Sequence, residues 1–159
     1  MTAMLEQVAF QELMSNNHCF GCGPHNDQGL QLKSHWEGDE SVATWQPQAH
    51  HAAGPAHVLN GGIIATLIDC HGVCTGVAAA YAAEGRAMGT APEFSGATAS
   101  LNVTYLRPTP LGAPVELRAR AIERKGRKIV VACTLTSAGQ ECARGEVVVV
   151  LVPADWGAA

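Results

Sequence analysis

Residues 57–83, which run HVLNGGIIATLIDCHGVCTGVAAAYAA, predict a loop followed by one long helix. Asn60 is a good N-cap, because its side-chain oxygen can accept a hydrogen bond from a free backbone N–H one turn ahead. Gly61 and Gly62 are poor helix formers, and their place in the first turn lets a ligand approach the free N–H groups. The residues that follow are apolar on nearly every face, so we expect a helix surrounded by protein that ends at about Ala83.

One acidic residue, Asp69, interrupts the apolar middle of this helix. A carboxylate in such a place must find partners or shift its pKa. It is either a structural aspartate bonded to a neighbouring element or a functional group, and perturbed carboxylates cluster at functional sites. Asp69, His71 and several glycines also argue against a membrane-spanning helix.

The chain has 159 residues, an apolar content of 47% and a net charge of −4. This length and apolar content predict a single domain, residues 1–159, with a substantial core. Only ten residues are Lys or Arg, which gives no support to a nucleic-acid surface or a polybasic membrane patch. Residues 1–14 carry acids and no Lys or Arg, unlike a secretory signal, and predict a short amphipathic helix. A cytoplasmic location is therefore expected, with the six cysteines present as thiols.

A C-x-x-C pair, Cys19 and Cys22, lies within the turn HCFGCGPHN at residues 18–26, inside an N-terminal segment of residues 1–27. A zinc site would need two more ligands, and the only other close pair, Cys70 and Cys74, is one turn apart on the long helix. There is no second C-x-x-C and no strand–helix–strand context for a redox motif. We therefore expect a turn with buried sulfur side chains and no stoichiometric metal, with a metal- or redox-sensing module as an alternative.

Alternating apolar and polar residues predict six strands. Residues 29–36 and 41–47 form a hairpin before the helix, and residues 84–97, rich in Gly, Ala, Pro and Ser, form a loop or lid after it. Four strands then follow at residues 98–106, 114–124, 128–137 and 142–152, before a tail at residues 153–159.

This order of elements excludes a Rossmann fold, which needs several crossover helices. It favours an α+β fold in which one antiparallel sheet wraps around a single helix. Such a sheet has exposed edges, so pairing with a second copy of the chain is expected.

The chain resembles the hotdog-fold acyl-CoA thioesterases, and among them the phenylacetate-degradation (PaaI-like) subfamily, from the Cys19 turn to about Val152. The strongest motif is N-G-G-x-x-x-T-L-x-D at residues 60–69. It is supported by CFGCGPHNDQGLQLKS at residues 19–34, LNVTYLRPTPLG at residues 101–112 and KGR at residues 125–127. The resemblance implies a hotdog fold, with about six antiparallel strands around one long central helix. It also implies hydrolysis of a small to medium acyl- or aryl-CoA.

The resemblance further implies roles for individual residues. The Gly61 N–H polarises the thioester carbonyl, and Asp69 is a general base on water or a nucleophile. Thr98 holds the position, just before the third strand, where some members orient the water with a hydroxyl. Asn60 replaces the histidine that members usually carry, so it can donate a hydrogen bond but cannot carry a proton. Gly54 stands where some members place a second carbonyl-binding Asn.

The spacing of these residues predicts a site shared between two subunits. Asn60 and Asp69 are nine residues apart, which is ~2.5 helical turns and more than ~13 Å along the axis. They therefore face opposite sides of one helix, and one helix is unsuited to bring both to a single carbonyl. We expect a homodimer, or a dimer of two dimers, in which one subunit supplies Gly61 and the other supplies Asp69, as the family is known to do.

The expected partner is a small-molecule acyl-CoA, with no cofactor beyond the coenzyme A of the substrate. The acyl chain would lie along the apolar helix and the phosphates outside it, where Arg and Lys side chains bind them. The expected substrate-binding residues are His57, Gly62, Arg107, Gly126, Arg127 and Lys128. The alternative for the three cations is that they are solvated charges at strand ends.

Two other functions stay open at this point. One is a non-hydrolytic acyl-CoA or acyl-carrier binding protein with the same fold. The other is a dehydratase relative, which usually carries His with Asp or Glu on the hotdog helix. The absence of a histidine at position 60 argues against the dehydratase. The identity of the acyl group does not follow from the sequence.

Overall fold

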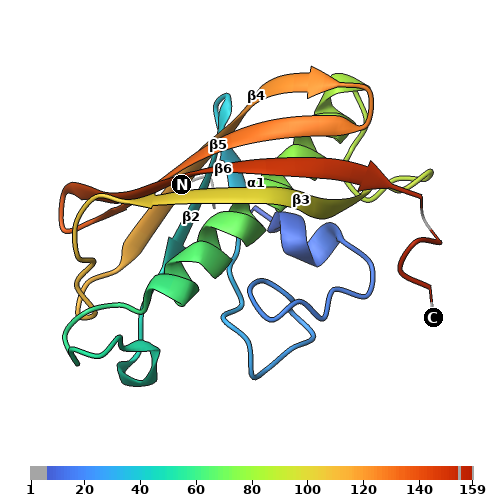
Figure 1. The fold of residues 1–159 in the computed structure, drawn as a ribbon. Coiled ribbons are helices and arrows are strands. Elements are labelled where there is room, and N and C mark those ends of the chain that lie inside the picture. Colours follow the sequence, from blue (N-terminus) through green and yellow to red (C-terminus); the bar gives the residue numbers. More distant parts are fainter. Residues whose placement is uncertain (1–6, 154, 159) are drawn as a thin grey trace, which may run out of the picture.

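A long helix, α1 (Gly61–Ala83), lies against one face of a six-stranded antiparallel sheet (Figure 1). The computed structural model describes residues 7–153 and 155–158. The strands are β1 (His35–Glu37), β2 (Glu40–Trp45), β3 (Ser95–Tyr105), β4 (Val115–Lys125), β5 (Lys128–Ser137) and β6 (Gln140–Val152). They pair in the order β1-β2-β4-β5-β6-β3, so β1 and β3 are the two edges of the sheet. This arrangement confirms the predicted α+β fold with one helix and six strands.

The beginning and the end of α1 follow from its sequence. The Asn60 Oδ1 accepts from the Gly62 N–H at 2.8 Å and from the Ile63 N–H at 3.1 Å, as expected of an N-cap. The helix ends at Ala83, as predicted, and Gly85 follows with a φ of 64°. A left-handed residue just past a helix end is a common way to stop it, and glycine adopts that conformation without strain.

The body of α1 is buried by the sheet. Gly72 lies so close to β6 that a Cβ at this position would be 2.5 Å from the Val147 Cγ2. By length and composition α1 could cross a membrane, yet 67% of its most apolar window is buried inside the fold. Packing in the core therefore accounts for its apolar character.

His71, in the middle of α1, takes part in a buried polar network. Its Nδ1 is 2.8 Å from the Ser34 Oγ, and its Nε2 is 3.1 Å from the Ser41 Oγ. The Ser41 hydroxyl also bonds to that of Thr75. Burial lowers the pKa of His71 to about 4, so the ring is neutral near pH 7 and joins α1 to the segments around β1 and β2.

The first predicted strand is wrong over most of its length. Residues 29–36 were expected to be paired, whereas β1 begins only at His35. The Leu30 N–H donates to the Phe20 carbonyl and the Leu32 N–H to the Gly21 carbonyl, so this backbone bonds to the Cys-rich turn. Both leucines are buried. The alternation of apolar and polar residues thus reports burial on the core rather than pairing in a sheet.

Two other boundaries also differ. β3 begins at Ser95, because residues 95–97 pair with residues 150–152 of β6, so Thr98 lies inside the strand instead of before it.

The predicted N-terminal helix is wrong within the described residues, where a short 3₁₀ helix, η1 (Phe10–Leu13), occurs instead. The Phe10 N–H bonds to the Ser34 carbonyl, which holds this segment against the core. Residues 1–6 of that predicted helix lie outside the described residues. A second 3₁₀ helix, η2 (Ala49–His51), precedes α1.

Candidate active site

The N-terminus of α1 presents a free backbone donor. The Asn60 side chain accepts hydrogen bonds from the N–H groups of Gly62 and Ile63. The Gly62 N–H is therefore already paired and is not free to bind a ligand. Over residues 7–153 and 155–158, the Gly61 N–H has no hydrogen-bond acceptor. It points from the positive end of the helix dipole, where a developing negative charge is stabilised.

Tyr105, at the end of β3, lies against this helix entrance. Its hydroxyl donates to the Gly61 carbonyl at 2.6 Å, and a Cβ at Gly61 would be 3.5 Å from the tyrosine ring. Tyr105 stands within the motif at residues 101–112, but no local pattern predicted it as a residue of the site. Half of the Tyr105 side chain is exposed. It fixes the position of Gly61 relative to the edge strand.

The Asp69 carboxylate lies further along α1 and is also held by β3. The Thr98 hydroxyl donates to the Asp69 Oδ1 at 2.7 Å. Burial raises the pKa of Asp69 above its ordinary value, and the hydrogen bond from Thr98 opposes that rise. The pairing of β3 with β6 is irregular between Thr98 and Ser100. A bulge of this kind re-aims side chains, and here it accompanies the turn of Thr98 towards α1.

The donor and the carboxylate are not brought together within one chain. Gly61 contacts β3 at Tyr105, and Asp69 contacts it at Thr98, seven positions away. At ~3.3 Å per residue, seven positions correspond to roughly 23 Å along the strand. A single subunit therefore carries the two catalytic candidates at two separate places.

The residues expected to contact coenzyme A also lie at two places within one chain, some near Gly61 and the others at the opposite end of the sheet. Arg107 follows β3 near the Gly61 end and donates to the Gln140 Oε1 at 3.2 Å. Gly126, with a φ of 59°, and Arg127 form the turn between β4 and β5 at the opposite end of the sheet, and Lys128 pairs with Val150. The loop that holds His57 lies with the Gly61 end, where its carbonyl accepts from the Leu111 N–H at 2.9 Å, and its side chain is exposed.

The cysteines are closer to one another than the sequence argument assumed. The sulfur atoms of Cys19, Cys22 and Cys70 all lie within 4.8 Å of one another, and those of Cys19 and Cys70 are 3.6 Å apart. Cys22 and Cys70 are buried as expected, whereas Cys19 is exposed. The sequence showed two separate pairs, because nothing in it indicates that the C-x-x-C turn packs on α1 next to Asp69.

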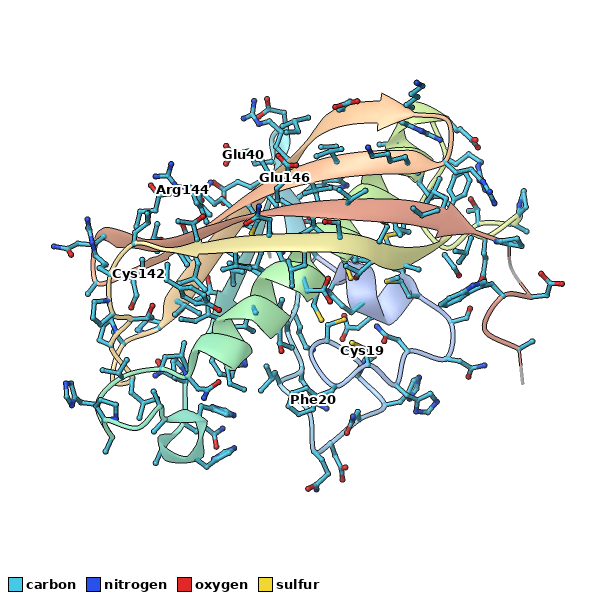
Figure 2. All side chains as sticks on the ribbon, in the orientation of Figure 1. Cys19, Phe20, Glu40, Cys142, Arg144 and Glu146 are labelled. Atoms are coloured by element: carbon cyan, nitrogen blue, oxygen red, sulfur yellow. The ribbon has the colours of Figure 1, made fainter. Side chains whose placement is uncertain are left out.

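A groove of about 640 Å³ lies on the other side of the sheet from α1 and contains none of the candidate residues. Figure 2 shows three of its lining residues, Glu40, Arg144 and Glu146, on that face, and Cys19 and Phe20 on the α1 side. Its three arginines, Arg118, Arg120 and Arg144, are all in ion pairs with carboxylates. Arg118 binds Glu37, Glu40 and Glu116, and Arg144 binds Glu141. The groove therefore offers no continuation of the candidate site.

Comparisons with known proteins agree with the fold and with the motif. The thioesterase superfamily model matches residues 56–143, from the loop before α1 into β6. A thioesterase superfamily protein of Shewanella loihica, of known crystal structure, is 39% identical, with 86% of this chain and 96% of that chain covered and a TM-score of 0.64.

Two further relatives are more distant. The acyl-coenzyme A thioesterase THEM4 of Mus musculus is 34% identical over 105 residues, which are 66% of this chain and 40% of the mouse protein. This chain thus matches less than half of that relative's length. A putative thioesterase of Ralstonia eutropha, described as phenylacetic acid degradation-related, is 18% identical over 77% of this chain and 86% of that chain. It shares the fold, with a TM-score of 0.60. The family match over more than half of the chain and the identity to the Shewanella structure show that this chain belongs to the thioesterase superfamily, with its hotdog fold.

Proposed function

We propose that this protein is an acyl-CoA thioesterase that hydrolyses the thioester of a small to medium acyl- or aryl-CoA. One observation carries the proposal: a free N–H at the start of a buried helix and a half-buried carboxylate held by a hydroxyl occur in a member of the thioesterase superfamily. The mouse relative, which is named an acyl-coenzyme A thioesterase, supports the choice of substrate. The motif at residues 60–69 supports placement in the PaaI-like subfamily.

The chemistry assigns one task to each group. The Gly61 N–H donates to the thioester oxygen and stabilises the negative charge that this oxygen gains in the tetrahedral intermediate. Asp69 either takes a proton from the attacking water or attacks the carbonyl carbon itself. Its raised pKa suits a base that works near neutral pH, and the Thr98 hydroxyl fixes its orientation. With water as the nucleophile, collapse of the intermediate releases the coenzyme A thiolate and the carboxylic acid, and the thiolate takes the proton that Asp69 had accepted. With Asp69 as the nucleophile, collapse releases the thiolate and leaves a mixed anhydride, which water then hydrolyses to the carboxylic acid and free Asp69. No cofactor takes part in either route.

The edge strand β3 supports a dimer in which these groups meet. β3 pairs only with β6, and its other edge is free within the described part of the chain. Leu101 pairs with Val147 on the α1 side of the sheet, yet it is 39% exposed. A second copy would cover it.

Antiparallel pairing of two β3 strands about an axis at Asn102 would set Leu101 of one copy opposite Val103 of the other. Because the bulge leaves Ala99 as an extra residue, the same register would set Thr98 opposite Tyr105. Asp69 of one subunit would then face Gly61 of its partner. The same pairing brings Arg107 to the turn at residues 126–128 of the other subunit. A single twofold rotation would thus bring the donor, the carboxylate and the expected coenzyme A contacts together. This supports a homodimer with two shared sites, or a dimer of such dimers. A cytoplasmic location belongs to the same proposal.

A Leu101→Lys substitution is expected to convert the dimer into an inactive monomer. Each introduced lysine would lie against Val103 of the other copy, close to the symmetry axis, where burial of a charge in an apolar contact is costly. Size-exclusion chromatography with light scattering should report half the wild-type mass, and thioesterase activity should fall below about a tenth. Ile122→Lys is the matched control, because Ile122 is 55% exposed on β4, away from the β3 edge. This variant should keep the wild-type mass in solution and the wild-type activity. A wild-type chain that is monomeric and active would contradict the assembly and the shared site together.

A thiol-release assay with a panel of acyl- and aryl-CoAs tests the function itself. We expect coenzyme A release with at least one substrate at a kcat/KM of about 10⁴ M⁻¹s⁻¹ or more. A blank without substrate corrects for reaction of the exposed Cys19 with the thiol reagent. Tight binding of an acyl-CoA without turnover would identify a non-hydrolytic binding protein. Addition of water to an enoyl-CoA with an intact thioester would identify a dehydratase.

A further inference from the structure

The sulfur cluster beside α1 has the dimensions of a metal site. Four thiolates around a zinc ion at ~2.3 Å lie roughly 3.8 Å from one another in a tetrahedron. The Cys19 and Cys70 sulfurs are 3.6 Å apart, and the Cys22 sulfur lies within 4.8 Å of both. These ligands come from two elements far apart in the sequence, a C-x-x-C turn and a helix.

The turn is shaped to place its two sulfurs on the helix. The Gly23 N–H donates to the Cys19 carbonyl at 2.8 Å, which closes the turn. A Cβ at Gly21 would collide with the Cys70 sulfur, and a Cβ at Gly23 would collide with the Cys19 backbone. Glycine at both positions therefore lets the turn close and lie directly against Cys70.

The surroundings supply a fourth sulfur and a supporting hydrogen bond. Cys74 lies one turn after Cys70 on α1, 2% exposed. The Cys74 thiol donates to the Met14 Sδ at 3.7 Å, so it is a nearby sulfur that a bound ion could recruit. The Asn17 Nδ2 donates to the Cys22 sulfur at 3.9 Å, the kind of contact that holds a metal ligand in place. Cys19 is exposed and gives an ion a path from the solvent.

We propose that Cys19, Cys22 and Cys70 bind one zinc ion, with Cys74 beside them as the candidate fourth ligand, and that this ion joins the Cys-rich turn to α1 next to Asp69. Three sulfurs within 4.8 Å of one another, with Cys74 one helical turn from Cys70, suit a soft tetrahedral cation better than a disulfide, which would join two of them and leave the others unpaired. Each thiol that ligates the ion releases its proton to the solvent. The ion has a structural role, separate from the proposed hydrolysis. The proposal replaces the expectation of no metal, which rested on the apparent separation of the two cysteine pairs.

Cobalt substitution tests the site without reference to activity. The full chain is purified with a chelator and a phosphine reductant, and Co²⁺ alone is added. We expect a thiolate-to-cobalt absorption band and the visible bands of a tetrahedral ion, which saturate at one cobalt per chain and disappear when Zn²⁺ is added. Cys22→Ser and Cys70→Ser should each lower the apparent zinc affinity more than about 100-fold, beyond the 10–100-fold typical of a lost supporting contact.

Cys142→Ser is the matched control. Cys142 is also buried, but its sulfur donates to the Gln140 carbonyl, a bond that a serine hydroxyl can keep. This variant should bind cobalt and zinc like the wild type. A reduced wild-type chain with six titratable thiols after unfolding and no cobalt spectrum would overturn the proposal. So would a Cys19–Cys70 disulfide that, once reduced, gives no metal uptake, or equal metal binding by the Cys22→Ser and Cys142→Ser variants.

Discussion

An Asp69→Asn variant is expected to fold normally and to lose about 10²–10⁴-fold in acyl-CoA turnover, the range for a lost general base. The amide keeps the size of the side chain, and its oxygen can still accept the hydrogen bond that Thr98 donates at 2.7 Å. What it loses is the ability to take up a proton or to attack the carbonyl. Because a half-buried charge is removed, we expect the free energy of unfolding to stay the same or to rise. Steady-state kinetics and urea unfolding measure the two effects separately.

The matched control for this variant is Asp39→Asn. Asp39 lies in the exposed turn between β1 and β2, where it makes an ion pair with Arg120 at 3.4 Å. An exposed pair of this kind contributes little, so activity and stability should both stay close to those of the wild type. The opposite pattern for Asp69→Asn would show that the residue is structural: a loss of ~1–3 kcal/mol in stability, with full activity in the protein that remains folded.

A Gly61→Pro variant should lose about 10²–10³-fold in kcat, because proline removes the N–H that stabilises the oxyanion. The backbone already suits proline there. Gly61 is the first residue of α1, where proline is favoured. Asn60 before it is extended, with φ −61° and ψ 133°, as a residue preceding proline must be. Gly61→Ala is the matched control, since it keeps the N–H and its Cβ makes an ordinary contact with Tyr105 at 3.5 Å. Its activity should stay within a few-fold of that of the wild type.

Mixing the two inactive variants tests the shared site. A heterodimer of one Asp69→Asn chain and one Gly61→Pro chain would hold one site with both intact groups and one site with neither. We expect recovery of up to about half of the wild-type activity per heterodimer. Tagged chains isolated by tandem affinity purification establish that heterodimers have formed. Verified heterodimers without recovered activity would mean that each chain supplies both groups itself, or that the Gly61 N–H is not the donor.

The parts of the structure that depend on nearby residues could be predicted from the sequence. The N-cap at Asn60, the end of α1 at Ala83 and the bounds of β5 all follow from local signals, namely a capping side chain, a run of apolar residues and alternation. The segment at residues 29–34 shows where this fails. Alternation reports which side chains are buried, and it does not tell whether the backbone bonds to a strand or to a loop such as the Cys-rich turn.

The parts that depend on distant residues could not be predicted in this way. The hydrogen bond from Tyr105 to Gly61 spans 44 positions, and the contact between Cys19 and Cys70 spans 51. No pattern within one segment records such contacts. The resemblance to hotdog thioesterases supplied Thr98 and Asp69 as residues of one site, and the structure brings them within hydrogen-bond distance. It carried no information about the cysteines of the turn and the helix.

The tight packing of α1 on β6 bears on how this protein would select among acyl chain lengths. At Gly72 and Gly145 even one added methyl group would meet Val147 or Ile68, at 2.5 and 2.6 Å respectively, so nothing can slide between the helix and the sheet. An acyl group would then have to lie beside α1, along the β3 edge that a second subunit would cover. The space between the two protomers would then limit the length of the acyl chain. Substitutions at the subunit interface, rather than in the core, would change which chain lengths the protein accepts.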